Sequence, residues 1–506
     1  MSDESVHAAL RSDASVVVVE APGGCGKTHQ GAAYARDAAP SNGRGRLLIL
    51  THTHAACSVF ASRTRNVASR VEIRTIDSVV AQLANAYHAG LGLPPDAGIW
   101  ARQNDDGYDW LAVKAAALVA RYPAIARSLA CRYPTIVCDE HQDSTGERHA
   151  LIMALHAQGA KLRVFADPMQ TVFRAKPFIG GCPALDWPAL TQAAGRYEEL
   201  DQPHRWNAGS RELGQWVLRA RAALKRGERL DLRGGLPPSV TVVRADNQAQ
   251  RALEYRPMPA DRRPLDHFVD APGSLMVLTS HNRAVQSLRS AFARRLLVWE
   301  GHTRKALATY VDALTAGAGD KDAIAAAVVA FIQETAVGFT GGGFADSFAQ
   351  DVDEGCRRAR RLKPAKLQEL ARLIVAEPDH RGAAKVLTRI AELRKADDDF
   401  QPIHIDALKE FHEAARLGAF ETAEAGFAEL SHRRAYIRPT PPEKSISTIH
   451  KAKGLECQNV MVAPCDANAF RNDQISRCLL YVAISRPTHR LMLVVPRNNP
   501  SPLLVL

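Results

Sequence analysis

The stretch Val16-Val-Val-Val-Glu-Ala-Pro-Gly-Gly-Cys-Gly-Lys-Thr28 decides the fold class of this chain. Its four consecutive valines predict a strand that is buried on both faces, as in the centre of a parallel sheet. A glycine-rich loop follows the strand, and the amphipathic run from Gln30 to Arg36 predicts a helix after the loop. Strand, glycine-rich loop and helix in this order are typical of a phosphate-binding P-loop.

The loop predicts a site for a nucleoside triphosphate. Backbone N–H groups of such a loop and the first turn of its helix bind phosphate oxygens. Lys27 is expected to neutralise phosphate charge, and the Thr28 hydroxyl to bind Mg²⁺. The alternative is an ordinary glycine turn, and the usual first glycine of the pattern is an alanine here. The predicted ATP-binding residues of the loop are Ala21, Pro22, Gly23, Gly24, Cys25, Gly26, Lys27 and Thr28.

Composition narrows the class of protein. Hydrophobic residues at 46% and charged residues at 24% are typical of a globular protein. The net charge of +11 favours a polyanionic partner such as nucleic acid, although a basic surface without that role is the alternative. Nine cysteines without a C-x-x-C pair argue against a zinc site, an Fe–S cluster or a disulfide framework. Without a signal peptide or a transmembrane run, we expect a cytoplasmic protein with no membrane partner.

Short apolar runs alternate with helical patterns along the chain, which predicts an α/β fold with parallel sheets. Two long helical segments, about 78–131 and 285–438, interrupt this alternation, so we expect two RecA-like motor cores that each carry a mainly helical insertion. Besides Val16–Val19, the predicted strands are Leu47–Leu50, Ile136–Cys138, Leu162–Phe165, Val240–Val243, Leu275–Leu278, Ile446–Thr448, Val460–Val462 and Leu491–Val495. The predicted domains are 1–78 with 132–203 (first core), 79–131 (its insertion), 204–300 with 440–506 (second core) and 301–439 (its insertion).

Two acids follow the predicted strand Ile136–Cys138, which makes this the second nucleotide motif. An acid at a strand end beside a P-loop binds Mg²⁺, and the next carboxylate is placed to activate the attacking water. Asp139 is therefore the predicted metal-binding residue and Glu140 the predicted general base. Asp-Glu after a strand is a weak signal alone, but its pairing with the P-loop strengthens it.

From these residues onward the chain resembles the superfamily 1A DNA helicases of the UvrD, PcrA and Rep type. Their second motif matches Asp139-Glu-His-Gln-Asp143, and their first matches the P-loop. The other stretches that resemble family motifs, in chain order, are Arg46–Ala56, Arg74–Ser78, Phe165–Phe173, Leu200–Arg205, Leu275–Ala291, Ser447–Glu456 and Tyr481–Arg486. The resemblance covers both predicted cores, about 16–210 and 440–495, whereas the insertions match chiefly in position and length.

The resemblance implies an ATP site between the two cores. In the family, the glutamine at the position of Gln170 reports on the γ-phosphate, and the arginine at Arg205 reaches the same phosphate. The glutamate at Glu456 binds the ribose, and the arginine at Arg486 acts as a finger across the cleft. The predicted catalytic residues are thus Lys27, Asp139, Glu140, Gln170, Arg205 and Arg486.

The resemblance also implies single-stranded or tailed DNA as the partner and 3′-to-5′ movement. The residues expected to contact DNA are Thr51, His52, Thr75, Phe173, Thr448, His450 and Lys451. His52, Ala175 and His204 stand where the family has aromatics, and Val6-His7-Ala-Ala9 lacks its adenine-contacting glutamine. We therefore expect weaker base stacking, and adenine selectivity stays open. The basic run Arg357–Lys366 is interpreted either as a solvated helix face or as a contact to duplex DNA.

Three functions remain after this reading. The first is an ATP-dependent DNA helicase or single-strand translocase. The second is a DNA-sensing ATPase subunit that regulates a partner nuclease in anti-phage defence, because the layout also resembles GajB, the helicase-like subunit of Gabija systems, whose partner would be an OLD-family-like nuclease. The third, an RNA-directed superfamily 1 enzyme, is disfavoured by Gln142-Asp143 and by the motif at Ser447–Glu456.

Overall fold

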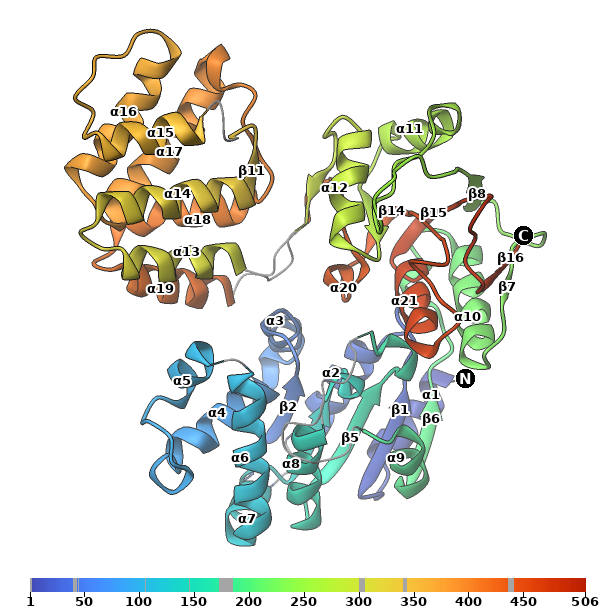
Figure 1. The fold of residues 1–506 in the computed structure, drawn as a ribbon. Helices are drawn as coiled ribbons and strands as arrows, with labels where there is room; N and C mark the ends of the chain where they lie inside the picture. The colour runs from blue at the N-terminus through green and yellow to red at the C-terminus, as the bar shows by residue number, and fades with distance from the viewer. Residues whose placement is uncertain are drawn as a thin grey trace. The chain divides into compact units, whose positions relative to one another are not determined.

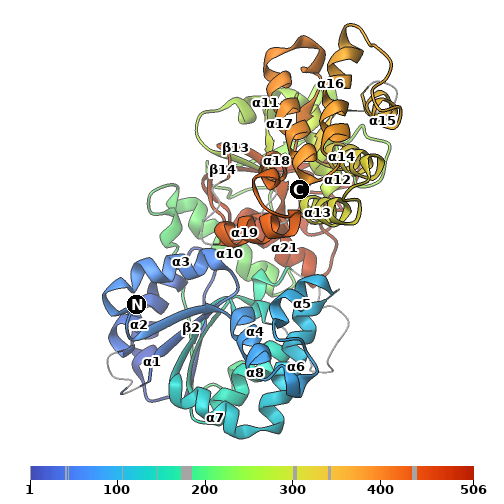
Figure 2. The ribbon, with the colours of Figure 1, turned by 90° about the vertical axis from the view of Figure 1, so that its left-hand side faces the viewer.

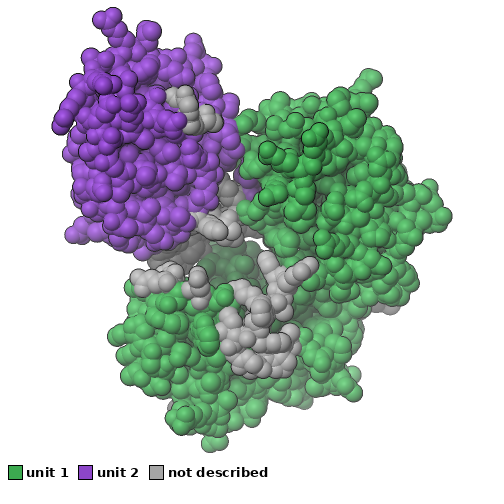
Figure 3. Space-filling view, in the orientation of Figure 1, with its two compact units in different colours: residues 1–296, 440–506 green, residues 297–439 purple. Residues whose placement is uncertain are grey.

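The computed structural model describes residues 2–39, 43, 45–104, 106–144, 146–172, 185–299, 305–339, 344–435 and 441–506. Phe173 and Ala175, on which sequence-based predictions fall, lie outside these ranges. The chain divides into two compact units, residues 1–296 with 440–506 and residues 297–439 (Figure 3). The predicted domain boundaries within the first unit stay predictions.

The first sheet contains the P-loop strand and is entirely parallel, with strand order β3-β2-β4-β5-β1-β6. Its strands are β1 (Val16–Glu20), β2 (Leu47–Thr51), β3 (Val71–Thr75), β4 (Thr135–Cys138), β5 (Lys161–Ala166) and β6 (Arg196–Glu199). Val17 and Val19 pack into one hydrophobic core, and Val16 and Val18 pack into another on the opposite face. The valine run is therefore buried on both faces, as the sequence predicts.

Helices cover both faces of the first sheet. On one side lie α1 (Ser2–Arg11), α2 (Lys27–Ala38) and α3 (His54–Arg63), and Figure 2 shows α4 and α6 on the other side of β2. The remaining helices are α4 (Ile76–Ala86), α5 (Ala97–Gln103), α6 (Gly107–Arg121), α7 (Pro123–Arg132), α8 (Gly146–Ala157) and α9 (Trp187–Ala193). The helical segment predicted as the first insertion shares its hydrophobic core with this sheet.

The second sheet is built from strands far apart in the chain (Figure 1). Within the first unit it has the order β13-β9-β14-β15-β8, and these strands are parallel. They are β8 (Val240–Arg244), β9 (Leu275–Thr279), β13 (Lys444–Thr448), β14 (Cys457–Val462) and β15 (Pro487–Val495). Their helices are α10 (Arg211–Lys225), α11 (Arg262–Asp270), α12 (Asn282–Ala291), α20 (Ile449–Ala452) and α21 (Gln474–Ile484). We call the two sheets with their helices the first and second core.

The second unit is a helical domain around one hydrophobic core. Its helices are α13 (Lys305–Ala316), α14 (Lys321–Thr335), α15 (Ala345–Asp353), α16 (Lys363–Ala376), α17 (His380–Ala396), α18 (Leu408–Arg416) and α19 (Ala423–Ala435). A short antiparallel pair, β11 (Ala336–Val337) with β12 (His404–Ile405), adds to the helices that the sequence predicts. The basic run Arg357–Lys366 crosses from a loop into α16.

The α/β fold class with two parallel-sheet cores is confirmed, and every predicted strand is present. Of the strands named above for the two cores, the sequence analysis missed β3 and β6. The β6 residues Arg-Tyr-Glu-Glu contain no apolar run, because this edge strand is largely exposed. In the described ranges, no helix is long and apolar enough to cross a membrane.

Candidate ATP site

Backbone geometry explains why the P-loop needs two of its glycines. Gly24 and Gly26 have φ values of +87° and +88°, a region that residues with a Cβ rarely adopt. A Cβ on Gly24 would also lie 2.8 Å from the Arg205 Cβ and 2.8 Å from a Trp206 ring carbon. The loop is therefore shaped both by its own turn and by the close approach of the Arg205 segment.

The loop opens into a cleft of about 970 Å³ that both cores line. Among the predicted residues, Ala21 and Cys25 are fully buried behind the loop, and they do not line the cleft. The predicted ATP-site residues that do line it are Pro22, Gly23, Gly24, Gly26, Lys27, Thr28, Glu140, Gln170, Arg205, Glu456 and Arg486. The structure thus brings together, in one cleft, predicted residues that lie more than 400 positions apart in the sequence.

Lys27 and Glu140 form an ion pair at the floor of the cleft. Burial raises the pKa of Glu140, but the charges of Lys27 and Lys453 outweigh burial and hold its pKa low, at about 2. Glu140 also has a φ of +54°, a left-handed conformation that is strained for a non-glycine residue. Such strain is common where a fold positions a reacting group, and it points the carboxylate at Lys27.

Asp139 has the features of a metal ligand. Its side chain is buried, and its Oδ1 atom has no hydrogen-bond partner. Burial raises the pKa of this carboxyl to about 7, so the site favours neutralisation of its charge by a proton or a cation. Carboxylate and hydroxyl oxygens suit Mg²⁺, and Asp139 and Thr28 are the residues that would bind it. When bound, Mg²⁺ would neutralise charge on the phosphates.

Three side chains converge on Gly23. A Cβ placed on this residue would lie 3.3 Å from Arg486 Nη2, 3.3 Å from Gln170 Nε2 and 3.4 Å from the Tyr481 hydroxyl. The Gly23 N–H donates a hydrogen bond to the Tyr481 hydroxyl at 2.8 Å. Gly23 is therefore the point where the P-loop of the first core meets α21 and the segment after it in the second core.

The two arginines of the second core differ in their partners. Arg486 is buried, and its described hydrogen bonds go to the Val482 and Leu455 carbonyls and the Ser485 hydroxyl, which are all neutral. Burial, followed by the like charge of Arg205, lowers the pKa of Arg486 to about 9. Arg205 donates to Glu456 at 3.0 Å and to the Ser485 carbonyl at 2.7 Å. The buried charge of Arg486 is thus the less compensated of the two.

Lys453 bridges the two cores in a way that the sequence did not predict. Its Nζ lies 2.6 and 2.7 Å from the two Asp143 carboxylate oxygens and 2.7 Å from the Gln170 carbonyl oxygen. The only signal in the sequence was its place in the stretch Ser447–Glu456, which resembles a family motif. The bridge joins the acid motif and the segment that contains Gln170 to the second core.

The residues predicted to contact DNA that the structure describes lie at strand ends or just after them and do not line this cleft. Thr51 and Thr75 are opposite each other at the ends of β2 and β3, and Thr448 lies opposite Thr279 at the end of β13. The Thr75 hydroxyl caps α4, and the Thr51 hydroxyl donates to the Thr53 carbonyl. Parallel sheets bind ligands at this edge.

His52 and His450, two of the residues predicted to contact DNA, are half-buried, and this burial favours their neutral form. His52 Nε2 lies 3.3 Å from the Ser144 hydroxyl, which also contacts His141, and burial lowers the pKa values of His52 and His450. Lys451 is partly exposed. Phe173 lies outside the described residues, so its predicted contact stays a prediction.

The nucleoside end of the cleft differs from the expected pattern. In place of the missing glutamine, α1 contributes Asp3, Glu4 and His7 to the lining. His204, which stands where the family has an aromatic, pairs with Asp3 at 2.7 Å and contacts Gly26 across the loop. A histidine held by a carboxylate therefore occupies the place of the stacking aromatic.

A P-loop and paired acids on one parallel-sheet core, faced by two arginines on a second, define a P-loop NTPase of the two-core motor class. Family models agree: residues 4–176 match an AAA domain, and residues 445–494 match the UvrD-like helicase C-terminal domain. With the fold, these matches support a UvrD/PcrA-like superfamily 1 helicase, which at family level is a DNA helicase or ATPase. A search of the curated proteins finds no match to the chain.

Proposed function

We propose that the chain hydrolyses Mg²⁺-ATP when it binds single-stranded DNA, and that it uses this cycle to move along the strand in the 3′-to-5′ direction. The observation that supports the proposal best is the convergence on Gly23 of Gln170 from the first core and Arg486 and Tyr481 from the second. Groups from two cores at one phosphate-binding loop tie hydrolysis to the closure of the cleft. The direction of movement rests on the family resemblance alone.

The roles of the side chains follow from their places in the cleft. Lys27 and the loop N–H groups bind the phosphates, and the negative charge of the nucleotide takes over from Glu140 as the partner of Lys27. Glu140 is then free to accept a proton from the attacking water. Gln170 and Arg486 adjoin the same loop position, so both are placed to contact the terminal phosphate. Arg205, paired with Glu456, joins them from the ribose side.

The first experiment is an ATPase assay without nucleic acid and with single-stranded DNA, duplex DNA or RNA. Wild-type turnover should rise most with single-stranded DNA, and Lys27→Ala should abolish it by removing the charge that neutralises the phosphates. Lys161→Ala is the matched control, because this exposed lysine begins β5 at the opposite end of the same sheet. A Lys27→Ala protein that keeps most of its stimulated turnover contradicts the ATP-site assignment.

Strand displacement separates the helicase from the alternative, a DNA-sensing ATPase subunit of a nuclease system. Each stacked base contributes about 1–3 kcal/mol, and His52 and Ala175 stand where the family has aromatics along the strand path. Binding that relies on phosphate contacts weakens steeply with salt. We therefore expect the isolated chain to hydrolyse ATP but to displace strands from 3′-tailed duplexes poorly above physiological salt. Robust, salt-insensitive unwinding supports an autonomous helicase and contradicts this expectation.

A further inference from the structure

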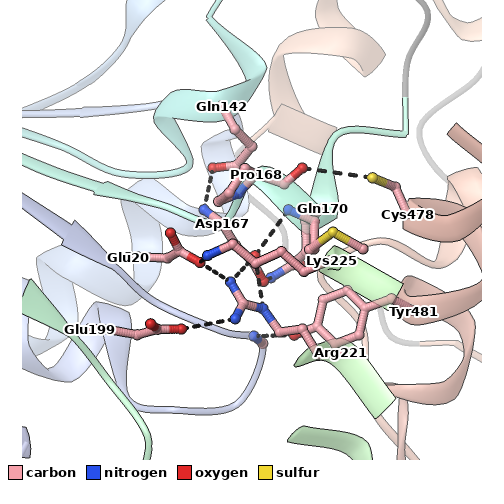
Figure 4. Close-up of polar contacts among 12 residues, drawn as sticks. Glu20, Gln142, Asp167, Pro168, Gln170, Glu199, Arg221, Lys225, Cys478 and Tyr481 are labelled. Carbon is pink, nitrogen blue, oxygen red and sulfur yellow. Dashed lines mark hydrogen bonds and ion pairs between the residues drawn. The ribbon is translucent and has the colours of Figure 1, made fainter. Parts of the chain in front are cut away.

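Three adjacent strands of the first core end in carboxylates that meet one arginine of the second core. Glu20 ends β1, Asp167 directly follows β5, and Glu199 ends β6. Arg221 on α10 pairs with all three, at 2.9 Å from Asp167 and 3.0 Å from Glu199, with Glu20 as the third partner (Figure 4). Its side chain is only 4% exposed, whereas Lys225, which also pairs with Glu20, is 39% exposed. We call these five residues the Arg221 cluster.

Asp167 connects the Arg221 cluster to the γ-phosphate sensor. Its Oδ1 accepts hydrogen bonds from Arg221 Nε at 3.2 Å and Nη2 at 2.9 Å. Its Oδ2 accepts one from Gln170 Nε2 at 2.9 Å. A carboxylate only accepts hydrogen bonds, so this contact fixes which end of the Gln170 amide faces Asp167. The same buried carboxylate thus holds Arg221 on one oxygen and Gln170 on the other.

A second branch leads from Asp167 to the predicted general base. The Asp167 backbone N–H donates to Gln142 Oε1 at 3.0 Å, and Gln142 Nε2 donates to Glu140 Oε2 at 2.5 Å. Glu140 in turn pairs with Lys27 of the P-loop. A displacement of Asp167 would therefore reach both Gln170 and Glu140, which lie on opposite sides of Asp167 along the chain of contacts.

We propose that Arg221 is a positioning residue for ATP hydrolysis: it fixes Asp167 and thereby aligns Gln170 and Glu140 with the terminal phosphate. The proposal rests on the ATPase function proposed above. Because Arg221 belongs to a helix packed on the second sheet, the alignment of first-core catalytic groups depends on the second core. Arg221 itself does not line the cleft.

Geometry explains why arginine is required at this position. Three carboxylates around one side chain need a planar group with several donors in fixed directions, which guanidinium provides and a lysine ammonium does not. Tyr481 lies under the guanidinium, with its ring centroid 5.9 Å from Arg221 Cζ, and limits where that group can move. Arg221→Lys keeps the charge but loses the simultaneous contacts.

The test compares Arg221→Lys with Arg477→Lys in the full-length chain. Arg477 is a buried arginine on α21 that bonds the Glu228 carbonyl just beyond α10, so the same change perturbs the packing of α10 without touching Asp167. We expect kcat to fall at least tenfold for Arg221→Lys, with the ATP dissociation constant within about threefold of wild type. Arg477→Lys should change kcat less than twofold at a similar loss of melting temperature.

A double-mutant comparison shows whether Arg221 acts through Gln170. In a Gln170→Ala background, Arg221→Lys should reduce kcat much less than it does in wild type, because part of its effect has been removed already. If Arg221→Lys does not fold, Asp167→Asn replaces it, with the same expected loss of kcat. If the fold-reduction in kcat of the double mutant equals the product of the two single-mutant reductions, the proposed route through Gln170 is wrong.

The outcomes distinguish this inference from the function on which it rests. If Lys27→Ala is inactive but Arg221→Lys and Asp167→Asn turn over like Arg477→Lys, the cluster only stabilises the fold and the positioning role is wrong. If the wild-type protein shows no turnover that depends on Lys27, the proposed ATPase function fails first and the positioning role fails with it. A fall in ATP affinity equal to the fall in kcat would also overturn it.

Discussion

Two buried arginines face the first core from the second, and they differ in what surrounds them. Arg221 pairs with Glu20, Asp167 and Glu199. Burial lowers the pKa of Arg221, but the charges of Asp167 and Glu20 contribute to a larger opposite effect and the pKa is raised. Arg486 donates to neutral oxygens, and burial lowers its pKa. A buried charge is costly unless it is paired, so the two sites have different energetic roles. The charge of the first is compensated within the chain, whereas the charge of the second would be compensated by the anionic nucleotide in the function proposed above.

The contrast teaches how to separate structural from functional charges in this molecule. Both residues are arginines with almost no exposure, so burial alone does not distinguish them. The chemistry of the acceptors does, because neutral acceptors satisfy hydrogen bonds without compensating charge. Substitution of each arginine by an uncharged residue of similar length should therefore differ most in its effect on stability, with a large loss at Arg221 and little change at Arg486.

The largest effect is expected for Arg486→Met. Loss of an arginine that stabilises transition-state charge typically costs about 10³–10⁵ in turnover. The free energy of unfolding should change by no more than about 1 kcal/mol, since the lost hydrogen bonds are offset by removal of a buried charge. DNA-stimulated ATPase rates and chemical denaturation measure the two quantities. A large loss of stability together with intact turnover would break the comparison.

Arg221→Met, in contrast to Arg486→Met, should lower the free energy of unfolding strongly. Removing one partner of a buried ion pair costs about 3–5 kcal/mol, because Glu20 and Asp167 stay buried with too little compensating charge. Chemical denaturation of this variant beside Arg486→Met gives the direct comparison. Equal stabilities of the two variants would mean that the carboxylates around Arg221 find other partners, and the distinction drawn above would be wrong.

Gly23→Ala sharpens the comparison from the side of the P-loop. The new Cβ would lie 3.3 Å from both Arg486 Nη2 and Gln170 Nε2, so these groups must shift by a few tenths of an ångström. Misplacement by 1 Å can cost about 10²-fold, so we expect kcat to fall by about tenfold. Nucleotide affinity, measured with a non-hydrolysable analogue, should change little. Unchanged kcat would show that the convergence at Gly23 is not used in hydrolysis.

The smallest effect is expected for Lys225→Met. This lysine pairs with Glu20, but it is 39% exposed, and Arg221 remains to compensate Glu20. Partly exposed ion pairs contribute about 1 kcal/mol or less. Denaturation should therefore show a loss within that range, and kcat should stay within twofold of wild type. A loss comparable to that of Arg221→Met would mean that the cluster depends on its total charge rather than on the guanidinium.

Much of the fold and of the cleft could be predicted because the signals are local. The valine run before the P-loop predicts a central parallel strand. Asp139 and Glu140 directly follow β4, at the same edge of the sheet as the P-loop. Parallel strands bring such residues together whatever the length of the chain between them. Arg205 and Arg486 were found through the family resemblance, because no local pattern marks an arginine that crosses a cleft.

The Arg221 cluster could not be predicted, because its members are far apart in sequence and none belongs to a recognised motif except Asp167. One signal was present: Glu20 is a carboxylate that ends a run of buried valines, and a buried acid needs a partner. The sequence does not say which of its 65 lysines and arginines that partner is. The edge strand β6, which supplies Glu199, was missed because it has no apolar run.

The Arg221 cluster also limits how this protein can be recombined. A chimera that joins the first core to a relative's second core at the start of α10 would separate Arg221 from Glu20, Asp167 and Glu199. Each half would then carry buried charges whose ion-pair partners are missing. Single substitutions meet the same barrier, since every intermediate leaves at least one charge unpaired. A chimera is therefore expected to fold only when α10 and the first core come from the same protein, or when all members of the Arg221 cluster are replaced together.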